Sequence, residues 1–126
     1  MEKSCKKILF LVVSILLFST TVAVVKLFSG IETSVKTTCC NAQAQYPGKT
    51  KVEALIEVLK SDTQSLDAKN DAIYALGYVR DTSALPVLRS LKTGARCDHK
   101  RYVCQRQLER TIRCIEGREK SIFNFR

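Results

Sequence analysis

Apolar residues follow two patterns along the chain, and the first is a continuous run. Residues 8–25 are apolar except for four hydroxyl side chains, those of Ser14, Ser19, Thr20 and Thr21. Extended to Phe28, the run has 21 residues. A helix of that length spans about 31 Å at roughly 1.5 Å per residue, which matches the hydrocarbon core of a bilayer. The sequence therefore predicts a short cytoplasmic N-terminus and one transmembrane helix in residues 1–28, with membrane attachment through residues 8–28.

Charged residues around this run predict its orientation. Lys3, Lys6 and Lys7 precede it and Lys26 follows it. An excess of basic residues marks the cytoplasmic side, so we expect the rest of the chain outside the cytoplasm. A secretory signal peptide has the same order of basic and apolar regions, which leaves export after cleavage at Thr21-Val22-Ala23 as an alternative. A buried helix of a soluble core is a weaker alternative.

Residues 29–50 carry no helical stripe of apolar positions. They are rich in Thr, Ser, Gln and Ala and contain Pro47-Gly48, a turn signal. We interpret this stretch as a flexible linker between the membrane and a folded domain.

The second pattern begins after Thr50 and has the period of a helix. Val52, Leu55, Ile56 and Leu59 lie at positions i, i+3, i+4 and i+7, which places them on one helical face. Residues 51–126 are thus predicted to form a helical domain.

Capping residues divide the rest of this domain into three further helices. A second helix is predicted to start at Asp67, a third at Asp81 or Thr82, and a fourth at Asp98. The fourth is expected to end near Gly117, because glycine commonly follows the last helical residue.

The predicted helices repeat at an offset of 32 residues. This shift aligns Leu76 with Leu108, and Ala72 with Cys104. Such self-similarity indicates an all-α fold, a short α-solenoid of antiparallel helical hairpins. Its predicted core comprises Leu55, Ile56, Leu59, Ala72, Leu76, Leu88, Leu91, Leu108 and Ile112.

Residues 67–91, DAKNDAIYALGYVRDTSALPVLRSL, resemble a HEAT repeat of the short bacterial type also found in phycobilisome lyase-like proteins. The resemblance lies in Ala72, in Ala75-Leu76-Gly77, in Asp81, and in the ALPVL stretch of residues 84–88 with Leu91. It implies a HEAT-like solenoid fragment that binds proteins. It does not imply lyase activity, because the chain is short and carries an apolar segment. Cys104 departs from the pattern, since alanine stands at the equivalent position of the first repeat.

Charge is distributed unevenly over the domain. The chain has 21 basic and 12 acidic residues, and those in residues 89–126 are mostly basic. Arg106, Arg110 and Arg113 are spaced by four and three residues, so they share a helical face and are the predicted partner-binding residues. A solvated surface without a partner is the alternative, and binding to an anionic surface is another. Nucleic acid is not expected, because no row of aromatic residues accompanies the arginines.

The chain contains six cysteines, of which five follow the apolar run. Disulfides persist outside the cytoplasm, and a bridge between Cys97 and Cys104 is predicted. A bridge from Cys97 or Cys114 to the Cys39-Cys40 pair is the alternative. Zinc is not expected at Cys97, His99, Cys104 and Cys114, because their spacing matches no common zinc pattern.

No catalytic constellation surrounds the single histidine, and no cofactor motif is present. The sequence therefore predicts a non-catalytic, membrane-tethered interaction module that binds a protein partner. The cysteines leave a thiol-dependent redox or accessory protein as an alternative, and the basic helix leaves a binder of anionic surfaces.

Overall fold

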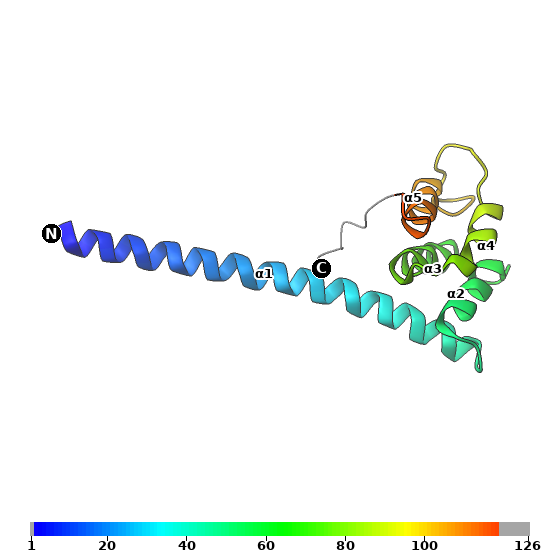
Figure 1. Cartoon of the computed structure of the whole chain (residues 1–126), viewed down its shortest axis with the longest axis horizontal. Helices are drawn as coiled ribbons and strands as arrows, with labels where there is room; N and C mark the ends of the chain where they lie inside the picture. Colours follow the sequence, from blue (N-terminus) through cyan, green and yellow to red (C-terminus); the bar gives the residue numbers. More distant parts are fainter. Residues whose placement is uncertain (1, 119–126) are drawn as a thin grey trace. The chain divides into compact units, whose positions relative to one another are not determined.

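The structure is a computed structural model that describes residues 2–118. Its elements are α1 (Glu2–Gln45), α2 (Lys51–Lys60), α3 (Leu66–Val79), the short 3-10 helix η1 (Thr82–Ala84), α4 (Leu85–Ser90) and α5 (Gln105–Ile115). Figure 1 labels the five α-helices. No strand occurs among the described residues, so the predicted all-α class is confirmed. The solenoid arrangement of hairpins stays a prediction. The chain divides into two compact units, Met1–Ser34 and Val35–Arg126.

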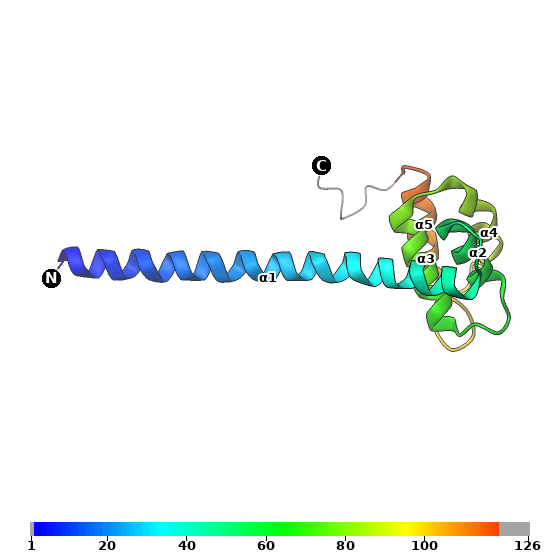
Figure 2. The ribbon, with the colours of Figure 1, turned by 90° about the horizontal axis from the view of Figure 1, so that it is seen from below.

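The first unit consists of the N-terminal part of α1, drawn as a continuous ribbon in Figures 1 and 2. This helix is long and apolar enough to cross a membrane, and its apolar window is entirely unburied. The hydroxyls of Thr20 and Thr21 donate to the carbonyls of Leu17 and Phe18 at 2.8 Å. Such bonds satisfy polar groups that an apolar environment would otherwise penalise. Length and composition therefore fit a membrane span, although a signal sequence shares them.

The flexible linker predicted over residues 29–50 must be corrected. Helix α1 continues to Gln45, and Val35, Cys39 and Ala42 are buried in the hydrophobic core of the second unit. These residues are four and three positions apart, so they form a helical stripe. Only Val35 of the three is strongly apolar, so the stripe gave a weak signal in the sequence. The predicted turn does form, with Gly48 at φ +84° between α1 and α2.

Helix α2 begins at a reciprocal pair of hydrogen bonds. The backbone N–H of Glu53 donates to Thr50 Oγ1 at 3.3 Å, and the N–H of Thr50 donates to Glu53 Oε2 at 2.8 Å. This capping box satisfies two amides that the helix leaves without partners. The bond from the Thr50 N–H also lowers the pKa of Glu53.

Two of the predicted helix starts are wrong. The N-cap of α3 is Ser65, whose hydroxyl accepts from the N–H of Ala68 at 3.1 Å, and not Asp67. The N-cap of α5 is Cys104, six residues after the predicted Asp98. Asp81 does begin the third helical segment, because its Oδ1 accepts from the N–H of Ser83 at 2.8 Å.

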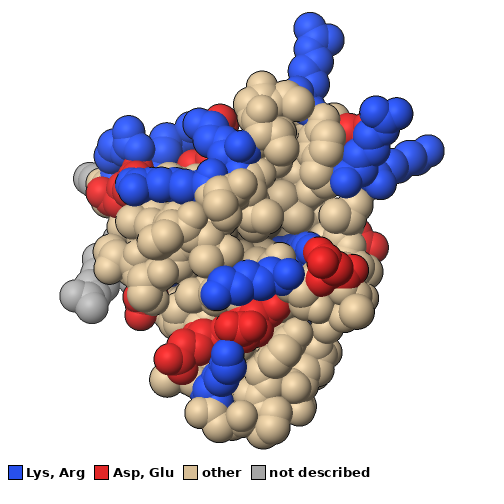
Figure 3. Space-filling view, turned by 90° about the vertical axis from the view of Figure 1, so that its right-hand side faces the viewer, with Lys and Arg blue, Asp and Glu red and all other residues tan. Residues whose placement is uncertain are grey.

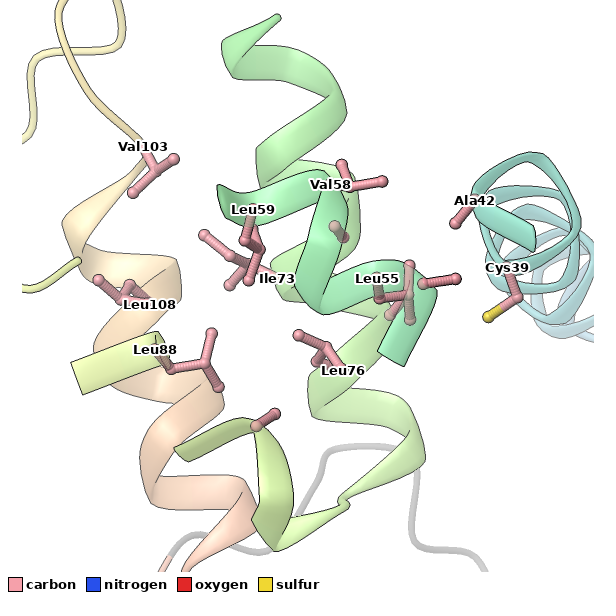
Figure 4. Packing of buried hydrophobic residues seen from close by; sticks show 14 of the residues in the cluster. Cys39, Ala42, Leu55, Val58, Leu59, Ile73, Leu76, Leu88, Val103 and Leu108 are labelled. Atoms are coloured by element: carbon pink, nitrogen blue, oxygen red, sulfur yellow. The ribbon is translucent and has the colours of Figure 1, made fainter. Parts of the chain in front are cut away.

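The core of the second unit lies around α3, which packs against both α2 and α5. Figure 2 shows α2 to α5 gathered together, and Figure 4 shows Leu59, Ile73, Leu88 and Leu108 directed toward a common interior. Of the predicted core residues, Ile56 and Leu91 are partly buried against this cluster. The others are buried, namely Leu55, Leu59, Ala72, Leu76, Leu88, Leu108 and Ile112.

The 32-residue repeat is kept at some positions and lost at others. Leu76 and Leu108 are both fully buried, as their alignment predicts. Ala72 is buried within α3, whereas its counterpart Cys104 stands before the first residue of α5. The late start of α5 leaves a loop at residues 91–104 where an unbroken repeat would have continued the helix.

Candidate functional site

The start of α5 is fixed on α3 by polar contacts. Asn70 Oδ1 accepts from the backbone N–H of Cys104 at 2.8 Å, and Gln107 Nε2 donates to the carbonyl of Asn70 at 3.2 Å. One turn further on, the hydroxyl of Thr111 donates to the carbonyl of Ile73 at 3.2 Å in a buried position. Hydrogen bonds require a defined geometry, so these contacts set the register of α5 along α3.

One buried side chain closes the loop that precedes α5. Gln105 is 5% exposed, and its Oε1 accepts from the N–H of Thr93 at 2.9 Å. Its Nε2 lies 3.2 Å from the carbonyl oxygens of both Leu91 and Val103 and donates to them. The two ends of the loop are thereby held together. Sequence reasoning missed this residue, because a glutamine in a basic helix gives no signal of burial.

Internal contacts also shape the loop. The hydroxyl of Tyr102 donates to the carbonyl of Arg96 at 2.9 Å, and the N–H of Lys100 donates to Asp98 Oδ1 at 3.1 Å. Asp98, predicted to cap a helix, instead forms a turn within the loop. Gly94 adopts φ +70°, a conformation that side-chain-bearing residues rarely take.

The loop brings Cys97 to the N-terminus of α5, beside Cys104. Their sulfur atoms are 4.0 Å apart, about twice the length of a disulfide bond, and both cysteines are free. The predicted bridge is therefore not formed, although the predicted pair is brought together. The backbone N–H of Arg106 donates to Cys97 Sγ at 3.4 Å, and this bond is the main reason why the pKa of Cys97 is lowered.

The remaining described cysteines have different surroundings. Cys39 is buried in the core, Cys40 is exposed on α1, and Cys114 is partly buried on α5. No two of the described cysteines are bonded, which leaves the alternative bridges to the Cys39-Cys40 pair unformed as well. Within residues 2–118, His, Cys, Asp and Glu side chains form no group able to hold a metal ion.

The predicted binding residues lie on the surface of α5. Arg106, Arg110 and Arg113 are all exposed. Two acidic residues pair with α4 or the chain after it: Glu109 of α5 with Lys92 at 3.1 Å, and Glu116, which follows α5, with Arg89 at 2.5 Å. Glu116 also contacts Arg118, and both partners lower its pKa.

Basic side chains gather at one end of the second unit. Figure 3 shows Lys and Arg around the upper part of one face, the part that holds the loop before α5 in Figure 1, and mixed charges below.

Helix α3 carries two exposed aromatic side chains that sequence reasoning missed. Tyr74 and Tyr78 are 36% and 44% exposed. Their spacing of four residues could have indicated a shared aromatic face.

In comparisons with known proteins, no family model, no curated protein and no solved structure matches this chain. The resemblance to HEAT repeats thus stays a prediction, and the function must be argued from the site itself.

Proposed function

We propose that this protein is a membrane-anchored interaction module whose helical domain binds an acidic protein partner. The face of α5 formed by Arg106, Arg110 and Arg113 is the binding surface. The observation that carries the proposal is the exposure of these three arginines on a helix whose register is fixed by α3.

Arginines spaced in this way suit the recognition of carboxylates. Each guanidinium can hold a carboxylate through two parallel hydrogen bonds, which gives direction as well as charge. The salt bridges of Glu109 and Glu116 with residues at or after α4 direct the acidic side of α5 away from this face. A helix held at both ends of its contact with α3 loses little freedom when a partner binds.

The anchor of the proposed module is the apolar part of α1 across residues 8–28, with the N-terminus in the cytoplasm and the domain outside. Support comes from the length and apolar character of the helix and from the lysines before it. Export after cleavage of this segment is the alternative location. The HEAT-like solenoid expected from the sequence would suit a protein-binding domain, since such repeats present helical faces to partners.

Partner capture by the full chain tests the binding surface. The chain, solubilised from its own membrane after mild crosslinking, is compared with a variant carrying Arg106→Gln, Arg110→Gln and Arg113→Gln. Retention of the partner should fall by roughly tenfold, about 1.4 kcal/mol. Higher salt should weaken the unmodified complex, because exposed ion pairs are screened.

A variant with Lys51→Gln, Lys60→Gln and Lys69→Gln is the matched control, because it removes the same charge from α2 and α3. It should retain the partner. Equal loss in both variants would point to net charge rather than to α5. Full retention in the arginine variant would contradict the proposal and direct attention to the tyrosines of α3.

Labelling of thiols in intact cells tests the orientation. Cys40 and Cys97 are exposed, so a membrane-impermeant reagent should modify both without lysis. Modification after lysis alone would place the domain in the cytoplasm and overturn this part of the proposal.

A further inference from the structure

A pair of free thiols lies at the N-terminus of α5, within a basic loop. Cys97 is exposed, Cys104 is partly buried, and their sulfur atoms are 4.0 Å apart. We propose that these cysteines form a thiol–disulfide exchange site. Cys97 is the attacking thiolate, Cys104 is the resolving thiol, and the substrate is a disulfide that carries acidic groups. This inference does not depend on the docking role of α5.

Cys97 has the position of an attacking group. Its sulfur accepts the N–H of Arg106, the second residue of α5, at 3.4 Å. Amides at the start of a helix have no partner within the helix and carry a partial positive charge, so they stabilise an anion. The pKa of Cys97 is lowered mainly by this bond, then by Cys104, by the N–H of Gln105 and by the charge of Arg106. An exposed thiol with these surroundings is reactive as a thiolate.

Cys104 has the position of a resolving group. As the N-cap of α5, it has its backbone held by Asn70 at 2.8 Å, and its side chain is less exposed than that of Cys97. A bulky disulfide from solution therefore reaches Cys97 first. Once Cys97 is modified, the sulfur of Cys104 is already close to it, with about 2 Å left to the length of a bond.

The charge of the loop selects the substrate. Residues 92–106 contain one acidic residue, Asp98, and five basic ones, Lys92, Arg96, Lys100, Arg101 and Arg106. Basic side chains also dominate this end of the domain in Figure 3. A positive field raises the local concentration of anionic molecules, so a disulfide with carboxylates is favoured over a cationic one.

The proposed exchange balances in two steps. The Cys97 thiolate attacks one sulfur of the substrate disulfide, forms a mixed disulfide and expels the other half as a thiolate. Cys104 then loses its proton and attacks Cys97 Sγ, which forms the Cys97–Cys104 disulfide and expels the second half. The protein dithiol is oxidised and the substrate disulfide is reduced to two thiols.

Glutathione disulfide serves as an anionic probe for trapping the intermediate. The full chain in detergent is reduced, freed of reductant, exposed to the probe and analysed by mass spectrometry without reduction. The unmodified protein should form the Cys97–Cys104 disulfide, and Cys104→Ser should accumulate glutathione on Cys97. In Cys97→Ser, modification of Cys104 should be roughly tenfold slower than that of Cys97.

Exposed Cys40 provides an internal reference for reactivity. At neutral pH, iodoacetamide should alkylate Cys97 roughly tenfold faster than Cys40, with the midpoint of its pH profile at lower pH. Cystamine, a cationic disulfide, should react more slowly with Cys97 than glutathione disulfide does, and added salt should reduce this difference.

Three results would overturn the assignment: equal alkylation of Cys97 and Cys40, a first adduct on Cys104, or loss of glutathione from Cys104→Ser as fast as from the unmodified protein. The variants Arg110→Gln and Arg113→Gln should exchange normally. Failure of the exchange site is thereby distinguishable from failure of the docking face.

Discussion

The two sides of α3 are held by different kinds of interaction. Toward α2 the core is apolar, with Ala54, Leu55, Val58 and Leu59 buried on the facing helix. Toward α5 the contact includes directional hydrogen bonds that Asn70 and Ile73 accept from Cys104 and Thr111, and a close approach at Gly77. Burial of apolar surface supplies most of the folding free energy but does not specify the register of two helices. Hydrogen bonds supply less free energy, but their geometry does specify the register. The first side thus holds the domain together, and the second determines where the site lies.

The largest expected effect is on the α2 side. Leu55→Ala should lower the free energy of unfolding by roughly 2–5 kcal/mol, because Leu55 is fully buried and its truncation leaves a cavity. Urea denaturation of the full chain in detergent, followed by the near-ultraviolet circular dichroism of its tyrosines, measures this loss. Val79→Ala, at a position 40% exposed, is the control and should change the free energy by less than about 0.5 kcal/mol. Similar losses of unfolding free energy in Leu55→Ala and Val79→Ala would contradict the assignment of Leu55 to the apolar core.

A smaller effect is expected where α3 and α5 approach closely. In Gly77→Ala the new Cβ would lie 3.0 Å from Thr111 Oγ1, whose side chain is fixed by its bond to Ile73. Crowding should cost about 1–3 kcal/mol and exceed the gain of roughly 1 kcal/mol in helix propensity. The same change made in a Thr111→Ala background should stabilise the protein. A double-mutant cycle by urea denaturation measures the coupling, and additivity would show that the helices do not meet there.

Asn70→Ala tests the polar side directly. Loss of the acceptor for the Cys104 N–H should cost about 1 kcal/mol, because that amide loses its partner. Asn70→Asp keeps an acceptor oxygen and should be milder. Hydrogen exchange of the Cys104 amide reports the bond itself, and unchanged protection in Asn70→Ala would contradict the contact.

A gain in stability is expected at the C-terminus of α3. Arg80 adopts the left-handed conformation at φ +60°, which costs a residue with a side chain roughly 1–2 kcal/mol. Arg80→Gly should therefore raise the urea midpoint slightly, whereas Arg80→Ala should not. A lower midpoint for Arg80→Gly would mean that contacts of the arginine side chain outweigh its backbone strain.

The smallest effect concerns pH. Glu53 in the first turn of α2 and Glu116 after α5 both have lowered pKa values, through bonds with Thr50 and with Arg89 and Arg118 respectively. A carboxyl group whose pKa is lower in the folded state stabilises it above the unfolded pKa, and this contribution is lost as pH falls through the folded value. Urea midpoints should therefore fall slightly below about pH 4.5. The fall should be smaller in Glu53→Gln and Glu116→Gln, and an unchanged fall would assign it to other acids.

Strong apolar periodicity predicted the central parts of the fold. Leu55, Leu76 and Leu108 carry enough apolar surface to mark their helical faces, and all three are fully buried. The sequence did not reveal where α5 begins, because that boundary depends on Asn70, which lies 34 residues before Cys104. The stripe of α1 was also missed, since Cys39 and Ala42 become core residues through packing and not through their own hydrophobicity.

The candidate site was also predicted only in part, because residue spacing indicates a shared helical face but not a long-range contact. Spacing placed Arg106, Arg110 and Arg113 on one face, and they are exposed together. The sequence predicted that Cys97 and Cys104 lie together. The 4.0 Å between their sulfur atoms depends on the conformation of the loop, which Gln105 holds closed. Such long-range polar contacts leave no periodic trace in a sequence.

The burial of Val35, Cys39 and Ala42 has a consequence for release of the domain by proteolysis. A cut that spares the core must fall before Val35, and between Phe28 and Val35 the chain is helical. Proteases bind extended chain, so a helical segment must unwind before it can be cleaved. A protein anchored through α1 would for this reason resist shedding, and a soluble fragment beginning at residue 51 would lack part of its own core.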